Sequence, residues 1–184
     1  MAKVHIMLLC TLCALSLSSL SAPQPALAAS GPDHLDFYMY IAVQNNSNLD
    51  NPNVTFTAVQ SAQPLSTQPN SFGIIHTFDN PLTSAADLNS TQLGHVQGWY
   101  GDVGQNLLTL FLAQTFTWND GTYNGTFSLL GVDVASDAVK FAPIVGGTGD
   151  FAYVRGVAQQ SLVSTATVNM ETVSWFFYAI DFVY

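Results

Sequence analysis

Residues Val173–Tyr184 read VSWFFYAIDFVY, a run with apolar side chains on both faces of an extended chain. One face carries Val173, Trp175 and Phe177, and the other carries Phe176, Tyr178 and Ile180. A strand that is apolar on both faces is buried on both faces. In a closed barrel only one face looks into the lumen, and the sequence offers no long amphipathic helix to cover the other. We therefore predict a closed barrel that forms a homo-oligomer.

Seven further runs of aromatic and β-branched residues precede this one, and turn signals such as Asn119-Asp120-Gly121 separate them. They predict strands over Leu35–Val43, Val54–Val59, Phe72–Phe78, His95–Tyr100, Leu107–Trp118, Tyr123–Val134 and Phe151–Val168. Asp79-Asn80-Pro81 and Gly101-Asp102 are interpreted as turns that end two of these strands. The fold class is therefore all-β, an eight-stranded antiparallel β-barrel, with a two-sheet sandwich as the alternative.

Residues 1–28 have the pattern of a secretory signal peptide. Lys3 precedes an apolar run over Ile6–Leu20, and Ala26-Leu27-Ala28 offers a cleavage site. A membrane anchor is the alternative, but the run is shorter than the ~20 residues that a span needs. The prediction is a secreted, extracellular protein whose single domain covers residues 29–184. Both cysteines leave with the signal peptide, so no disulfide is expected in that domain.

Charged residues make up 8% of the sequence, and the formal net charge is −9. Lys140 and Arg155 are the only cationic Lys or Arg side chains in residues 29–184. Such a chain lacks the basic surface that tracks phosphates, so nucleic acid and anionic membranes are not expected partners. Sequons at Asn45, Asn53, Asn89 and Asn124 are candidate glycosylation sites in a secreted chain.

Motifs for cofactors and metals are missing from the sequence, so neither is predicted. His34, His76 and His95 are spaced too widely for a local metal motif. The glycine-rich run over residues 144–151, IVGGTGDF, has no following helix and no Lys-Ser/Thr pair for phosphates. It is interpreted as a tight turn that needs glycine.

Five segments together resemble the plant dirigent protein family. They are FYMYI (37–41), FGIIHTFDNPLT (72–83), HVQGWY (95–100), YNGTFSLLGVDV (123–134) and IVGGTGDFAYVRG (144–156). The resemblance implies an eight-stranded antiparallel barrel, related to that of allene oxide cyclase, which assembles as a trimer in the plant apoplast. It also implies a protein without oxidase activity of its own.

In that family a separate oxidase or laccase makes phenoxy radicals, typically from coniferyl alcohol. The barrel binds them and imposes stereo- and regioselectivity on coupling, as in lignan biosynthesis. Some relatives act as dehydratases or cyclases on phenolic quinone methides. For this chain, guided radical coupling is the leading hypothesis. The alternatives are a quinone methide dehydratase or cyclase, and a non-catalytic wall scaffold or phenolic- or carbohydrate-binding module.

The resemblance also suggests site residues. Asp133 matches a pocket aspartate implicated in proton transfer, Tyr100 a pocket tyrosine, and Lys140 stands where many members have a pocket arginine. These three are the candidate catalytic residues, and the candidate substrate contacts are Tyr40, His76 and Asp79. The family commonly reads FYxHD in the first strand, where this chain has Tyr40 and Ile41 in place of His and Asp. Arg155 is interpreted as a scaffold residue paired with an acid.

Overall fold

A computed structural model describes residues 31–43, 55–60, 72–168 and 171–184. Every element of the described residues is a strand: β1 His34–Val43, β2 Phe56–Gln60, β3 Ile74–Thr83, β4 Gln92–Asp102, β5 Thr109–Asn119, β6 Asn124–Val134, β7 Val139–Gly149, β8 Arg155–Val168 and β9 Glu171–Val183. Within these residues, no helix has the length and hydropathy to cross a membrane.

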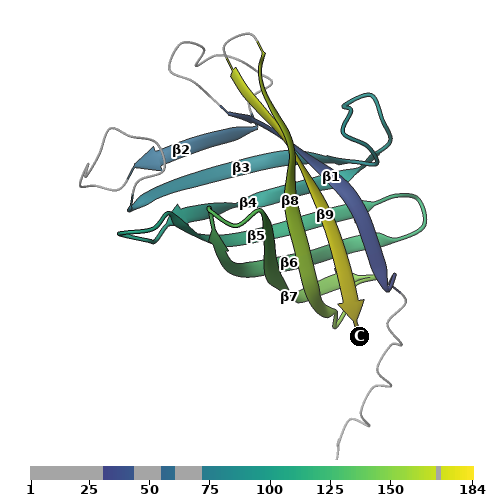
Figure 1. Ribbon diagram of the computed structural model, residues 1–184. Helices are drawn as coiled ribbons and strands as arrows, with labels where there is room; N and C mark the ends of the chain where they lie inside the picture. The colour runs from purple at the N-terminus through teal and green to yellow at the C-terminus, as the bar shows by residue number, and fades with distance from the viewer. Residues whose placement is uncertain (1–30, 44–54, 61–71, 169–170) are drawn as a thin grey trace, which may run out of the picture.

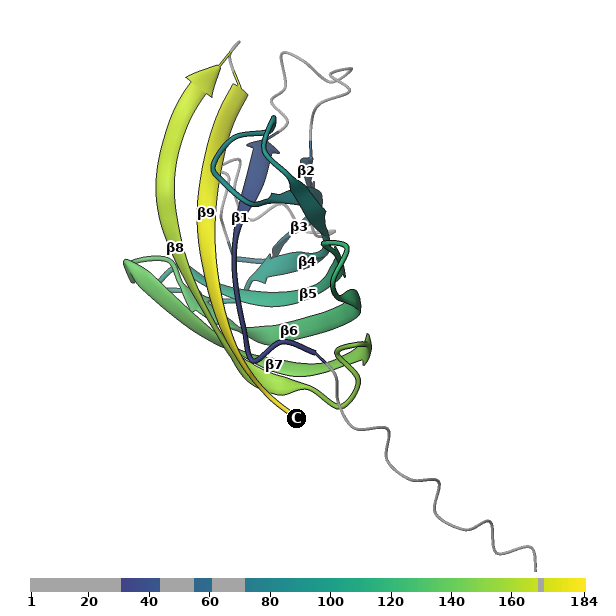
Figure 2. The ribbon, with the colours of Figure 1, turned by 90° about the vertical axis from the view of Figure 1, so that its right-hand side faces the viewer.

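Eight strands close into an antiparallel barrel, as predicted. The order runs from β3 to β9 along the chain, and β1 joins β9 to β3. The ladder between β1 and β9 is long, from His34↔Asp181 to Val43↔Thr172, whereas β1 meets β3 through only Tyr38↔Thr83 and Met39↔Leu82. In Figure 1, β8, β9 and β1 cross in front of β3–β7. In Figure 2 these two groups of strands face each other.

The predicted and observed strands differ in several places. The predicted strand Val54–Val59 is β2, a short strand that pairs antiparallel with β3 and meets β1 in parallel at Val43↔Phe56, so it lies beside the direct β1–β3 contact as an addition to the eight. The eighth barrel strand is β7, and the prediction of a tight turn over residues 144–151 was wrong for residues 144–149, which belong to this strand. Of the glycines in that run only Gly149 has a left-handed conformation, with φ of 64°, and the turn itself follows at residues 150–153.

Gly147 is needed because neighbouring backbone atoms pack closely against it within β7, and not because the chain turns there. A Cβ added there would lie 2.4 Å from the Thr126 carbonyl oxygen and 2.5 Å from that of Phe151. Gly147 pairs with Phe127, whose ring is fully buried, so it faces the interior. Its neighbour Gly146 faces outward, and a Cβ there would meet only the Arg155 guanidinium, at 3.5 Å.

We expect Gly147→Ala to lower the free energy of unfolding by about 1–3 kcal/mol, because backbone atoms cannot move away from the new methyl group. Gly146→Ala is the matched control, since its methyl group would find ordinary contact distance. Denaturant unfolding of the two variants measures the difference. Equal stabilities would contradict the packing explanation.

Two predicted turns are also parts of strands. β3 continues through Asp79-Asn80-Pro81 to Thr83, where the register shifts, and β4 continues through Gly101 to Asp102. Because β4 extends to Asp102, this residue lies on the same face of the strand as Tyr100 and joins the candidate site.

Aromatic side chains fill one end of the lumen. The buried rings are Phe37, Phe116, Trp118, Phe127, Phe151, Tyr178 and Phe182. Phe127 is central: it stacks on Phe116 at 4.7 Å between ring centroids and meets Phe151 at 5.0 Å and Phe182 at 5.2 Å. This end is a packed core, so any room for a ligand must lie toward the other end.

Aromatic side chains on the outer face of β9 pack beside those of its neighbour β1. Phe177 packs against Tyr38 at 5.3 Å between ring centroids, and Trp175 packs against Tyr40 at 5.1 Å. Apolar side chains remain exposed further round the barrel, over β6, β7 and β8. They include Leu130, Val132, Phe141 and Val157.

Candidate functional site

The end of the lumen opposite the aromatic core is polar. Strand alternation turns His76 of β3, Tyr100 of β4, Asp133 of β6 and Lys140 of β7 inward, so the structure brings together four of the six residues proposed from the sequence. Lys140 Nζ lies 2.9 Å from Asp133 Oδ1. The aspartate is buried and the lysine side chain is 21% exposed, so this ion pair stands at the border between core and solvent.

A small hollow of about 20 Å³, open to solvent on one side, adjoins the ion pair. Its lining includes Leu112, Gln114, Asp133, Lys140, Gln160 and Tyr178. The Tyr178 hydroxyl accepts hydrogen bonds from Gln160 Nε2 at 2.8 Å and from Gln114 Nε2 at 3.2 Å. Burial raises the pKa of Tyr178, so the hydroxyl keeps its proton and can itself donate to a ligand oxygen.

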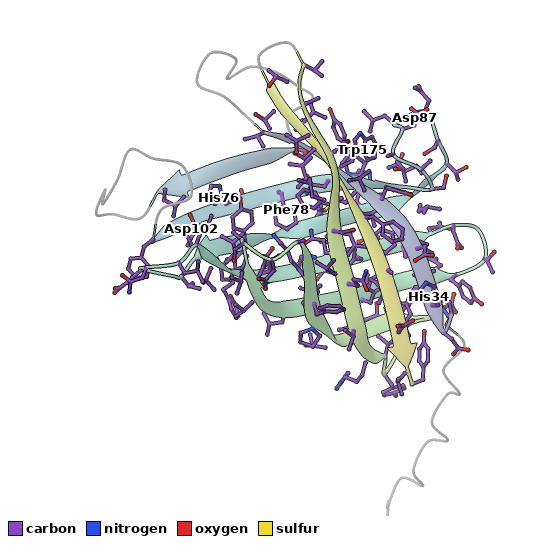
Figure 3. The ribbon with its side chains drawn as sticks, in the orientation of Figure 1. His34, His76, Phe78, Asp87, Asp102 and Trp175 are labelled. Carbon is purple, nitrogen blue, oxygen red and sulfur yellow. The ribbon has the colours of Figure 1, made fainter. Side chains whose placement is uncertain are left out.

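A second polar group lies on β3 and β4. The His76 ring stacks on Tyr100 at 4.5 Å between centroids, and His76 Nε2 lies 3.8 Å from Asp102 Oδ2. Figure 3 shows His76 and Asp102 near each other on these strands, with Phe78 further along. Burial raises the pKa of Asp102 to about 6 and lowers the pKa of His76, because both lose solvation of their charged forms. Burial, and then the Asp102 and Asp133 carboxylates, raise the pKa of Tyr100.

Four residues near this group were not predicted from the sequence: Asp102, Gln114, Gln160 and Tyr178. Asp102 was hidden by the assumption that Gly101-Asp102 is a turn. The glutamines gave a usable signal: each occupies an inward position of an otherwise apolar strand face, where an amide needs a hydrogen-bond partner. Tyr178 supplies that partner to both.

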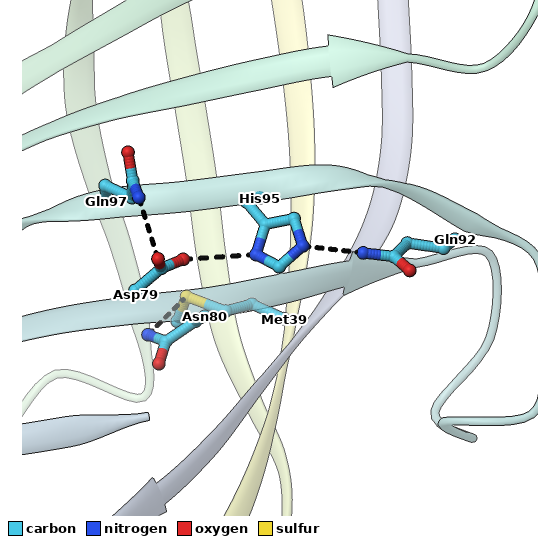
Figure 4. A network of polar contacts seen from close by, with 6 residues as sticks. All are labelled: Met39, Asp79, Asn80, Gln92, His95 and Gln97. Carbon is cyan, nitrogen blue, oxygen red and sulfur yellow. Dashed lines mark hydrogen bonds and ion pairs between the residues drawn. The ribbon is translucent and has the colours of Figure 1, made fainter. Parts of the chain in front are cut away.

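Tyr40 and Asp79 lie on the outer face, apart from this group. Tyr40 alternates with the buried Met39 and packs on Trp175. Asp79 Oδ2 accepts from Gln97 Nε2 at 2.7 Å and Oδ1 from His95 Nδ1 at 3.1 Å. Figure 4 shows this chain, which Gln92 extends by donating to His95 Nε2.

The next residue, Asn80, points the other way. Its Nδ2 lies 3.6 Å from Met39 Sδ inside the barrel. Ile41 also points inward and packs against the core, so the first strand contributes a hydrocarbon where the resemblance would place an aspartate.

The described sequons lie at the surface. Asn89 is exposed in the loop between β3 and β4, and Asn124 is exposed at the start of β6. Asn45 and Asn53 lie outside the described residues, as does the predicted signal peptide. Glycosylation at all four stays a prediction.

The buried carboxyl of Asp102 should make stability depend on pH. Its pKa is about 6 in the folded protein against an ordinary 3.8. Well below pH 3.8 the group is protonated in both states. As the pH rises toward 6 it ionises first in the unfolded chain, which lowers the free energy of unfolding by about 1–3 kcal/mol.

Asp102→Asn removes this titration. We therefore expect the variant to gain stability relative to the wild-type protein between pH 4 and pH 7, measured by denaturant unfolding at both values. Asp87→Asn, at an exposed loop position, is the control and should show no such gain. A stability difference that is the same at both pH values would contradict the burial argument.

A family model, curated relatives and a solved structure all indicate the same family for this chain. A family model described as "Dirigent-like protein" matches residues 33–180. Dirigent protein 23 of Arabidopsis thaliana is 39% identical over 105 residues, which cover 55% of this chain and 56% of that protein. Pterocarpan synthase 1 of Glycine max is 33% identical over 133 residues, covering 71% and 68%. The solved structure of a pterocarpan synthase dirigent protein matches with a TM-score of 0.65 at 30% identity, covering 80% of this chain and 93% of that one.

Proposed function

Since the chain belongs to the dirigent-like protein family, we propose that it binds a phenolic radical or quinone methide in the polar end of its barrel and directs the stereo- and regiochemistry of the next bond. The observation that carries this proposal is the Asp133–Lys140 ion pair beside the hollow that Tyr178 lines. A separate oxidase or laccase would supply the radical. Coniferyl alcohol is the first substrate to test, and the expected product is of the lignan type.

The geometry suggests a role for each group. The rings of Tyr100 and Phe78, 6.5 Å apart, offer aromatic faces on which a phenol can stack. The Lys140 ammonium and the Tyr178 hydroxyl can donate to ligand oxygens, which fixes which face of the ligand is open to attack. The Asp133 carboxylate can accept the proton of a hydroxyl that adds to a quinone methide carbon.

Cyclisation of a quinone methide by the protein itself is the second candidate function. The similarity to pterocarpan synthases favours it. Such a reaction needs a proton donor and a proton acceptor in the lumen but no oxidant, because a hydroxyl adds across the methide while the ring regains aromaticity.

The test has two arms. In the first, a laccase oxidises coniferyl alcohol with and without the protein, and chiral chromatography measures the enantiomeric ratio of the coupled product. In the second, the protein alone is given a hydroxylated isoflavanol that yields a quinone methide on loss of water. We expect an enantiomeric excess or accelerated ring closure in at least one arm. A racemic product in the first and no acceleration in the second would contradict the proposal and favour a scaffold role.

We further propose that the protein is secreted and forms a homotrimer. The exposed apolar side chains over β6–β8, Leu130, Val132, Phe141 and Val157, support burial against another copy. Light scattering should give three times the subunit mass, and N-terminal sequencing of secreted protein should begin near Ala29. A stable monomer at micromolar concentration, or a secreted species that retains Met1, would contradict these two points respectively.

A further inference from the structure

Asp102 is a buried acid that the roles assigned so far leave unused. Its side chain is fully shielded from solvent, and neither carboxyl oxygen has a hydrogen-bond donor among the residues that the structure describes. His76 Nε2, at 3.8 Å from Oδ2, is close enough to exchange a proton after a small movement or through one water molecule. Burying a carboxyl group without a hydrogen-bond donor costs folding free energy, which points to a role for Asp102 outside stability.

Strand register places Asp102 in the same row as Asp133. Asp102 of β4 pairs with Leu110 of β5, and Leu110 pairs in turn with Asp133 of β6. Two strand spacings of about 4.8 Å separate the two backbones by about 10 Å. Both side chains point to the inner face of the sheet, and the distance between them is about the length of one aromatic molecule.

The surroundings of the two carboxyl groups differ. Asp133 has the Lys140 ammonium at 2.9 Å and forms an ion pair. Asp102 faces His76 from β3 and the Tyr100 ring from β4, and its β5 neighbour Leu110 is apolar. Burial raises the pKa of Asp102 to about 6, so its carboxyl group is largely protonated in mildly acidic solution, and burial lowers the pKa of His76, which favours the neutral ring. Two carboxyl groups whose environments separate their protonation states can act as an acid and a base.

We propose that Asp102 is a second proton-exchanging residue of the lumen, which donates to the oxygen of a bound quinone methide while Asp133 accepts a proton from the attacking hydroxyl. The proposal rests on the proposed function and adds the acid of that reaction. His76, whose Nε2 lies 3.8 Å from Asp102 Oδ2, is the positioning residue, through which a proton returns to Asp102.

The proton and electron balance of this step is closed. The hydroxyl oxygen forms a bond to the methide carbon, and its proton goes to Asp133. The electron pair of the methide double bond moves into the ring, and the quinone oxygen takes the proton of Asp102. Water then accepts the proton from Asp133, and a proton from water returns to Asp102 through His76, whose ring takes it up on one nitrogen and gives one up from the other. The product is an isomer of the quinone methide, so no oxidant or reductant is needed.

The test compares Asp102→Asn with wild-type protein in both arms described above, between pH 4.5 and pH 7.5. The wild-type rate or selectivity should fall as the pH rises through about 6, because the donor ionises. Asp102→Asn should lower it about tenfold or more at pH 5 and remove this pH step. His76→Gln should shift the midpoint of the step, and Asp102→Glu should restore part of the activity. Asp87→Asn, at an exposed loop position, should behave as wild type.

Thermal unfolding of each variant separates loss of the acid from loss of structure. If Asp102→Asn folds and keeps the wild-type rate and pH profile while Asp133→Asn loses activity, the second acid is excluded and the proposed function stands. If wild-type protein directs neither reaction at any pH, the proposed function and this inference both fail.

Discussion

Asp133→Asn should lower the yield or selectivity of the directed reaction about a hundredfold, while the barrel and its assembly stay intact. Asparagine keeps the size of the side chain but cannot accept the proton. It also leaves the Lys140 ammonium, 2.9 Å away, without its counter-ion. The measurement is the initial rate and enantiomeric ratio in whichever arm is active, with thermal unfolding to confirm the fold.

Lys140→Met and Arg155→Met form a matched pair for the same site, since each removes one cation. Lys140 lines the hollow, so its loss should resemble that of Asp133. Arg155 is exposed and donates to the Val154 carbonyl at 2.8 Å. Among the described residues it has no acidic partner within ion-pair distance, which corrects the prediction of a paired scaffold residue. Arg155→Met should therefore keep full selectivity. Loss of selectivity there, with Asp133→Asn unaffected, would reverse the assignment.

Phe127→Ala should lower the free energy of unfolding by about 3–5 kcal/mol, a large part of the stability of a single domain. Phe127 is fully buried and contacts the rings of Phe116, Phe151 and Phe182, which cannot all collapse into the space it leaves. Denaturant unfolding measures the loss. Leu88→Ala, at a side chain that is 53% exposed in a loop, is the control and should change stability by less than about 0.5 kcal/mol. Similar losses in both variants would contradict the location of the core.

The barrel could be predicted because its signal is spread over every strand. Alternating aromatic and β-branched residues mark β1, β5, β6 and β9, and each prediction depends on several side chains. β7 was missed because it carries Gly146, Gly147 and Gly149, which usually indicate a turn. Only the structure shows that Gly147 is fixed by the backbone of Thr126 and Phe151 packing against it.

The candidate site was harder to predict because side chains alternate along a strand, so an error of one residue in the alternation exchanges inward-facing and outward-facing side chains. Once His76 is placed in the lumen, alternation sends Asp79 to the outer face, and the same reasoning separates Tyr40 from Met39. Asp102 was hidden behind Gly101, which reads as the end of a strand. The pairing of Asp133 with Lys140 depends on two strands joining across a turn, a distance that spacing alone cannot give.

A crystal structure of the protein with a bound phenolic product tests the central claim most directly. Pinoresinol, or the ring-closed product if the second arm is the active one, should lie in the polar end of the lumen. One oxygen should be within hydrogen-bond distance of Asp133 or Lys140, and an aromatic ring should face Tyr100 or Phe78. Product bound only on the outer face, for example beside Asp79 and His95, with the lumen free of ligand, would contradict the account.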